Sequence, residues 1–188
     1  MPRRQVRFQQ GGCYHIYNRG HNCQPIFFER DNYIHFLRLM HHHLVGETLD
    51  LLAYCLMPNH YHFLVQLKED ALSPAMHRLI MAYSKAINRR YQRVGTLFQG
   101  PFRAIAITEI SYLYHLVHYI HANPVKAHLV DHPKDWEFSS YPEYANLRNG
   151  KLPNPTQLYR LANISPAQLL EERTSALPPA LIPLLLDA

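Results

Sequence analysis

The chain alternates between segments with a strand-like pattern of apolar residues and segments with a helical one. Two apolar runs, from Leu49 to Leu56 and from Phe63 to Val65, lie on either side of Pro58 and Asn59. Turn residues between two such runs are typical of a tight β-hairpin. Two further runs have the composition of strands, and they cover residues 13–18 and 104–108. We therefore expect four strands, two of them joined by a hairpin.

Apolar residues recur every three or four positions in three other segments, which predicts a helix in each. The expected helices cover residues 30–45, 73–93 and 110–122. Pro74 suits the first turn of the second helix, whereas Pro124 should end the third at or near Asn123. The order of strand, helix, hairpin, helix, strand and helix predicts an α+β fold, with a ferredoxin-like antiparallel sheet and helices packed on it.

The pattern changes after residue 145, so we expect a domain at residues 1–145 and a C-terminal extension punctuated by prolines at residues 146–188. Residues 149–155 resemble a linker, and Ser165-Pro166-Ala167 predicts the start of a short helix. Residues 177–186 are apolar but interrupted by prolines. This last segment could pack on the core, contact a second chain, or do neither.

The composition narrows the class of protein. A formal net charge of +5 over 188 residues favours an anionic partner. The three cysteines form no close pair, so a reducing compartment fits better than a disulfide framework or a four-cysteine zinc site. The first ten residues are polar and basic, unlike a signal peptide, and no stretch approaches the roughly 20 apolar residues of a membrane span. We expect a cytoplasmic protein that does not enter a membrane.

Positive charge gathers on one face of the second expected helix, and no acidic residue lies between Ser73 and Arg93. The residues of this basic face are Arg78, Lys85, Arg89 and Arg93, with Arg90 beside them. Like charges at these spacings repel one another mildly, and a bound polyanion would relieve that repulsion. An ordinary solvated helix face is the alternative interpretation.

Histidines stand out in two places. Side chains of a strand alternate between its faces, so His60 and His62 should share one face, with their α-carbons about 6.5 Å apart, while Tyr61 points to the other. Two imidazoles at that spacing can reach one metal ion, although packed and hydrogen-bonded histidines are the simpler alternative. His41, His42 and His43 lie on an expected helix, where consecutive side chains diverge by about 100°, so we expect a solvated face there.

The third expected helix carries a second set of polar residues on one face, namely Tyr112, His115, Tyr119 and Asn123. Pro58-Asn59-His60-Tyr61-His62 resembles the histidine–hydrophobic–histidine motif of HUH endonucleases, with Tyr61 in the middle. Residues 119–127 resemble the tyrosine-bearing helix end of single-tyrosine transposases, especially the REP-associated tyrosine transposase branch. Residues 11–15, 95–103 and 136–141 resemble the same branch, so the likeness covers about residues 11–141.

The resemblance implies a transposase-like, metal-dependent single-strand DNA endonuclease and strand transferase that acts on hairpin or palindromic DNA. Tyr119 would form a covalent 5′-phosphotyrosine, and His60, His62 and Asn123 would hold Mg²⁺ or Mn²⁺. The expected DNA-binding residues are Arg19, Lys85, Arg89, Arg90, Arg93 and Arg103. Related proteins often carry a basic residue where Pro101 stands here, which removes one expected phosphate contact. The resemblance leaves open whether the protein acts as a monomer or a homodimer.

Two other functions fit parts of the same pattern. A domesticated DNA-binding protein could recognise palindromes without cutting them, although such a protein would have no use for the histidines, Tyr119 and Asn123 together. A plain metal phosphodiesterase could use the histidines while Tyr119 is only structural. His115, one helical turn before Tyr119, could assist proton transfer, contact phosphate, or simply be a polar surface residue.

Overall fold

The computed structural model describes residues 6–170, and its four strands form one antiparallel sheet with the order β2-β3-β1-β4. The strands are β1 (Cys13–Arg19), β2 (Leu49–Met57), β3 (His60–Leu67) and β4 (Arg103–Ile107). Helix α1 (Arg30–His43) connects β1 to β2, and α2 (Leu72–Arg90) connects β3 to β4. This order and connectivity is the ferredoxin-like topology, so the fold class predicted from the sequence is confirmed.

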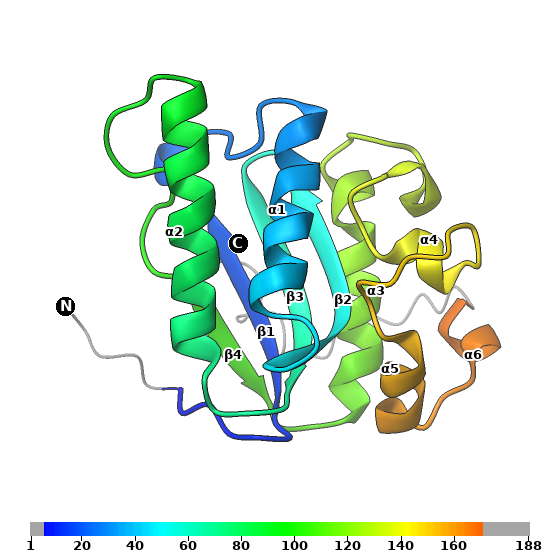
Figure 1. Cartoon of the computed structure of the whole chain (residues 1–188). Helices are drawn as coiled ribbons and strands as arrows, with labels where there is room; N and C mark the ends of the chain where they lie inside the picture. The colour runs from blue at the N-terminus through cyan, green and yellow to red at the C-terminus, as the bar shows by residue number, and fades with distance from the viewer. Residues whose placement is uncertain (1–5, 171–188) are drawn as a thin grey trace.

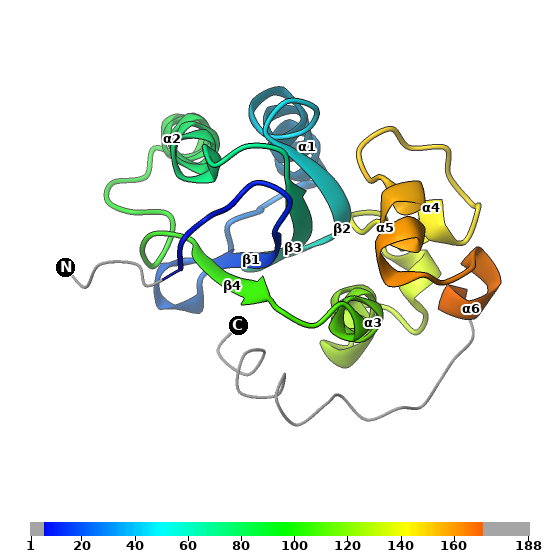
Figure 2. The same ribbon diagram turned by 90° about the horizontal axis from the view of Figure 1, so that it is seen from below.

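The helices lie in layers on both faces of the sheet (Figure 1). Helices α1 and α2 cover one face, and α3 (Ser111–Lys126) covers the other, as the view along the sheet shows (Figure 2). Five short helices complete the described chain, and they are η1 (His21–Cys23), η2 (Pro133–Asp135), α4 (Tyr141–Tyr144), α5 (Pro155–Ala162) and α6 (Pro166–Leu170). No helix within residues 6–170 is long and apolar enough to cross a membrane.

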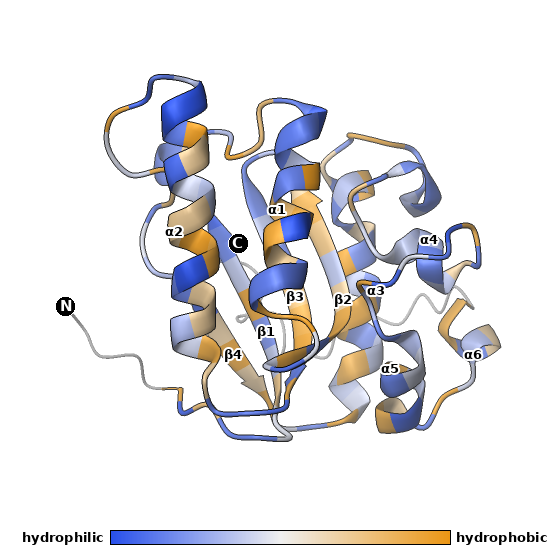
Figure 3. Cartoon of the chain, in the orientation of Figure 1, coloured by the Kyte–Doolittle hydropathy of each residue, from blue (hydrophilic) through white to orange (hydrophobic). Residues whose placement is uncertain are grey.

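Side chains alternate between the two faces of the strands, so each face of the sheet packs against its own hydrophobic core. Tyr61 and Phe63 of β3 face the first core, between the sheet and the α1–α2 layer, together with Phe36 and Tyr83. Leu64 faces the second core, under α3. The four residues of α3 predicted to face a core are buried there, namely Leu113, Leu116, Val117 and Ile120. Figure 3 shows that β2 and β3 are mostly apolar, whereas α1 and α2 carry both apolar and polar residues along their length.

Phe36 joins three elements of the first core. Its ring centroid lies 4.8 Å from that of Tyr83 on α2 and 5.4 Å from that of Tyr61 on β3. We expect Phe36→Ala to lower the free energy of unfolding by about 3–5 kcal/mol, because it leaves a cavity between the layers. Urea denaturation measures this loss. His42→Ala, on the exposed face of the same helix, should change stability by less than about 0.5 kcal/mol; equal effects of the two changes would contradict the packing.

Helix α3 runs past the proline that was expected to end it, so that prediction is wrong. Pro124 lies inside the helix, which continues to Lys126. A proline has no N–H to donate to the carbonyl four residues earlier, here that of Ile120. The Nδ2 of Asn123 lies 3.5 Å from the Ile120 oxygen and donates to the Tyr119 oxygen at 2.9 Å. The amide side chain of Asn123 thus offers the Ile120 oxygen a long hydrogen bond in place of the missing backbone donor.

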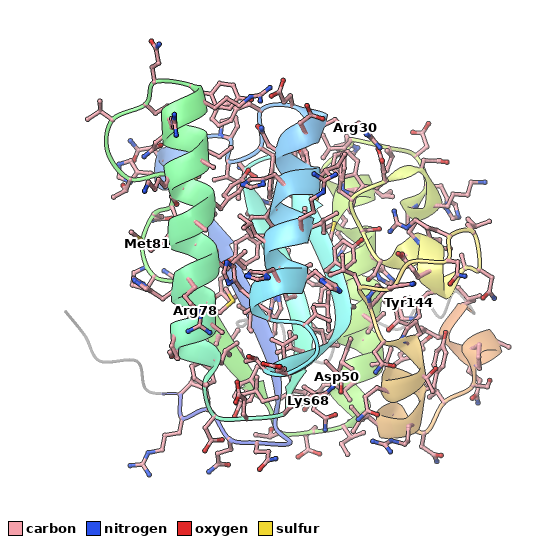
Figure 4. The ribbon with its side chains drawn as sticks, in the orientation of Figure 1. Arg30, Asp50, Lys68, Arg78, Met81 and Tyr144 are labelled. Carbon is pink, nitrogen blue, oxygen red and sulfur yellow. The ribbon has the colours of Figure 1, made fainter. Side chains whose placement is uncertain are left out.

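The described part of the C-terminal extension packs on the domain. The backbone N–H of Asn154 donates to the oxygen of Leu51 on the edge strand β2 (2.7 Å), and Leu158 and Leu169 are buried against the second core. Just before the extension, Tyr144, which is labelled in Figure 4, donates its hydroxyl to the Leu52 oxygen (2.5 Å). The segment that resembled a linker therefore covers a sheet edge. Residues 177–186 lie outside the described range, and the domain division remains a prediction.

Candidate active site

The first residues of β3 carry the two histidines of the predicted metal site. β3 pairs with β1 so that His60 lies opposite Arg19 and His62 opposite Tyr17. Directly paired residues point to the same face of a sheet, which is here the face under α3. The ring centroid of Tyr119 on α3 lies 5.7 Å from that of His62. The two histidines and Tyr119, distant in sequence, therefore meet within one chain.

His60 is oriented by the hairpin turn. Asn59 donates its Nδ2 to the oxygen of Cys23 (3.2 Å), which directs its Oδ1 toward His60. The distance from that Oδ1 to the His60 Nδ1 is 2.6 Å. An amide oxygen only accepts, so Nδ1 of His60 carries the hydrogen and its Nε2 carries the lone pair. Nε2 is the atom that could bind a metal ion.

His62 is completely buried, and its ring centroid lies 5.0 Å from that of His60 with the ring planes 84° apart. Its Nδ1 lies 3.0 Å from the Nε2 of His15. Among residues 6–170, nothing hydrogen-bonds to its Nε2. A buried nitrogen without a partner is unfavourable unless a ligand satisfies it. The two Nε2 atoms are therefore suited to a divalent cation.

A third protein ligand must be of another residue type. Across the described part of the chain, no three His, Cys, Asp or Glu side chains are grouped as metal ligands. Asn123 lies one helical turn after Tyr119 and uses its Nδ2 on the helix backbone. Its Oδ1, a hard oxygen, is the atom that could complete the site. The residues present thus fit a metal with two imidazole nitrogens and an oxygen.

The burial of the site favours neutral imidazoles. Desolvation, together with the nearby charge of Arg19, lowers the pKa of His60 to about 4. Desolvation also lowers the pKa of His62 well below its usual value, with His15 and His60 adding to the effect. Metal ions bind the neutral form of histidine. Both side chains are therefore in the ligating form at neutral pH.

Tyr119 is half-buried, and its environment acts on the phenol in opposite directions. Desolvation raises the pKa of Tyr119, and the nearby Tyr17 raises it further, whereas a hydrogen bond with the Asn123 side chain lowers it. The Nζ of Lys126 lies 4.8 Å from the centre of the Tyr119 ring. The phenol is therefore protonated at neutral pH, and positive charge beside it would stabilise the phenolate.

The sequence profile of the family described as "Transposase IS200 like" matches residues 10–123, more than half of the 188-residue chain. The chain belongs to the IS200-like transposase family. This membership confirms the resemblance to transposases that the histidine and tyrosine motifs indicated. No curated protein sequence matches the chain.

A solved structure described as a REP-associated tyrosine transposase bound to a REP hairpin has the same fold. It aligns with a TM-score of 0.65 and 18% sequence identity, over 82% of this chain and 98% of the other. At this identity the likeness concerns the fold.

Two of the arginines expected to bind DNA lie beside the histidines. Arg19 and Arg103 line a cavity of about 260 Å³ together with Tyr17, whose ring centroid is 6.1 Å from that of His62. Arg19 donates its Nε to the Oε1 of Gln99 (2.7 Å), which holds its guanidinium at the cavity wall. Pro101 lines the same cavity.

The other four expected DNA-binding residues lie on or just after α2, across the sheet from the histidines. Lys85 and Arg89 are exposed, Arg90 forms an ion pair with Glu29 (2.5 Å), and the Arg93 guanidinium lies 5.4 Å from the centre of the Phe28 ring. The loop after α2 reaches the end of β1, where the N–H of His21 donates to the Leu97 oxygen (3.0 Å). These residues form a second basic region, separate from the cavity.

Three residues contribute to this site although the sequence did not predict a part in it for them. His15 and Asn59 hydrogen-bond to the two histidines, and Lys126 lies over Tyr119. Alternation places His15 on the same face of β1 as Tyr17 and Arg19, but only the pairing of β1 with β3 brings that face to His62. The spacing of residues within either strand does not reveal how the two strands are paired.

Proposed function

We propose that this protein is a metal-dependent endonuclease and strand transferase for single-stranded DNA with a hairpin or palindrome, and that Tyr119 is its nucleophile. The observation that carries the proposal is the position of Tyr119 over His62, whose buried Nε2 has no partner within residues 6–170. A nucleophile beside two ligand nitrogens is an arrangement suited to metal-assisted phosphoryl transfer to a tyrosine.

The reaction proposed is a reversible exchange of phosphate esters. The phenol oxygen of Tyr119 attacks the phosphorus of a phosphodiester, and the bond from phosphorus to the 3′ oxygen breaks. The phenol loses one proton to solvent, and the departing 3′ oxygen takes up one proton. The products are a 5′-phosphotyrosine and a free 3′-hydroxyl. Because the phosphotyrosine keeps the energy of the broken bond, a 3′-hydroxyl can attack it and rejoin DNA.

His60, His62 and Asn123 would hold the cation, which when bound would polarise the scissile phosphate and stabilise negative charge on its oxygens. Imidazole ligands favour Mn²⁺ over the harder Mg²⁺, and both ions suit the oxygen of an amide. Lys126 adds positive charge next to the phenol, where phenolate develops. Asn59 keeps His60 in the tautomer that can ligate.

Each chain brings Tyr119 to its own His62, so a monomer carries all the proposed catalytic groups. A homodimer in which each subunit uses its own tyrosine fits the same geometry. Single-stranded DNA would reach the site from the cavity at Arg19 and Arg103, while the basic region of α2 would contact a stem.

The deciding experiment is a search for protein-linked DNA. Wild-type protein is incubated with 5′- and 3′-labelled single strands that carry a hairpin, with Mn²⁺ or with EDTA. We expect an adduct that retains the label of the 3′ fragment, releases a free 3′-hydroxyl, needs the metal, and maps to Tyr119 by peptide mass spectrometry. Hairpin binding without any cleavage would instead indicate a palindrome-binding protein without nuclease activity.

The arginines of the cavity should contribute to DNA affinity through phosphate contacts. We expect Arg103→Gln to weaken binding of single-stranded hairpin DNA and to lower the slope of log affinity against log salt by about 0.7, the effect of one lost phosphate contact. Fluorescence anisotropy over a salt series measures both quantities. Arg160→Gln removes the same charge from the exposed surface of α5 and should leave the slope unchanged; equal slopes for the two variants would exclude a phosphate contact at Arg103.

A further inference from the structure

His15 is a buried polar residue that has no role in the proposed reaction as described above. It lies on β1 and is 1% exposed, and its Nε2 lies 3.0 Å from the Nδ1 of His62. The two ring planes are 16° apart, with centroids separated by 5.1 Å. This is the geometry of one hydrogen bond between the edges of two nearly coplanar rings. An imidazole in such a position costs free energy that an aliphatic side chain would not.

The two imidazoles share one hydrogen between them. Both rings are buried, so both are neutral, and a neutral imidazole has one N–H and one lone pair. If His62 donates from Nδ1 to His15, the Nε2 of His62 has a lone pair. If His15 donates from Nε2 instead, the Nε2 of His62 carries the hydrogen and cannot bind a metal ion. Only the first arrangement gives a ligand.

The other histidine of the site has an equivalent partner from a different part of the fold. The Oδ1 of Asn59 accepts from the Nδ1 of His60, and the oxygen of Cys23 fixes the orientation of that amide. Both ligand histidines thus have their Nδ1 engaged and their Nε2 available. Partners of this kind orient metal-binding histidines and set their tautomer in other metal sites.

We infer that His15 is a positioning residue: it accepts the Nδ1–H of His62 and so keeps the Nε2 of His62 unprotonated and aimed at the metal ion. This inference rests on the proposed metal site. It assigns to β1 a part in metal binding, although no β1 side chain is itself a ligand. Replacing His15 by a residue that cannot accept a hydrogen bond leaves a buried donor on His62 and frees its ring to turn.

Two matched variants test the role of the acceptor. His15→Leu fills the space without an acceptor, and we expect it to weaken Mn²⁺ binding about 10- to 100-fold, measured by isothermal titration calorimetry. In His15→Gln the amide oxygen reaches the position of the lost Nε2, so Mn²⁺ affinity should stay within about threefold of wild type. Circular dichroism verifies that both variants are folded.

Nuclear magnetic resonance of the wild-type protein tests the same point without a mutation. With Mg²⁺ bound, we expect the hydrogen of His62 on Nδ1 and a nitrogen–nitrogen coupling across the bond to His15. A hydrogen on the Nε2 of His62 overturns the inference, as do folded variants with equal losses or with no loss. Wild-type protein that binds no Mn²⁺ would overturn the metal site itself, whereas wild-type binding with an unaffected His15→Leu overturns only the role of His15.

Discussion

Tyr119→Phe should abolish the covalent protein–DNA adduct, with a loss of roughly 10³-fold or more in the rate of adduct formation, because it removes the only atom that attacks phosphorus in the proposed reaction. Phenylalanine keeps the ring that lies 5.7 Å from the ring of His62, so the packing of α3 on the sheet should be preserved. Hairpin affinity should therefore stay close to that of wild type. Denaturing gel electrophoresis of labelled DNA measures the adduct, and anisotropy measures binding.

Tyr112→Phe is the matched control, since Tyr112 is a half-buried tyrosine on the same helix and lies one residue after its start. This variant should form the adduct at the wild-type rate. An adduct that persists in Tyr119→Phe would show that another nucleophile is used. Cleaved DNA with free ends in Tyr119→Phe would instead indicate a metal phosphodiesterase in which water attacks.

His60→Ala should reduce metal-dependent cleavage by about 10²- to 10³-fold, because a cation that has lost one ligand contributes less of the several kcal/mol of charge stabilisation it supplies to phosphoryl transfer. His60 is half-buried at the start of β3, so the change creates no cavity in either core. Cleavage rates over a Mn²⁺ titration should show both a weaker apparent affinity and a lower rate at saturation. Hairpin binding in EDTA should be unaffected.

His42→Ala provides the corresponding control, because it removes an imidazole from the exposed face of α1. Its cleavage rate and Mn²⁺ dependence should equal those of wild type. If His60→Ala were as active as His42→Ala, the metal would have to bind elsewhere, and the assignment of His60 as a ligand would be wrong. Equal losses in both variants would point to a general effect on the protein.

Helix α3 was predicted only in part by rules that use neighbouring residues in the sequence. Its apolar face was predicted correctly, because Leu113, Leu116, Val117 and Ile120 recur at helical spacing and contact the second core. The end of the helix was predicted wrongly, because the expectation that a proline ends a helix takes only backbone groups into account. The side chain of Asn123 donates to the carbonyl that Pro124 leaves without a donor. A hydrogen bond between a side chain and a backbone group three residues earlier depends on a rotamer that sequence spacing does not specify.

The sequence by itself determined the elements of this protein and the common face of His60 and His62, because helical and strand periodicities are local properties of the backbone. The tertiary structure alone decided what meets at that face. The pairing of β1 with β3 brings His15 to His62, the hairpin turn brings Asn59 to Cys23, and the docking of α3 brings Tyr119 over the histidines. These contacts join residues far apart in the chain, and they follow from strand register and core packing, which only the folded molecule fixes.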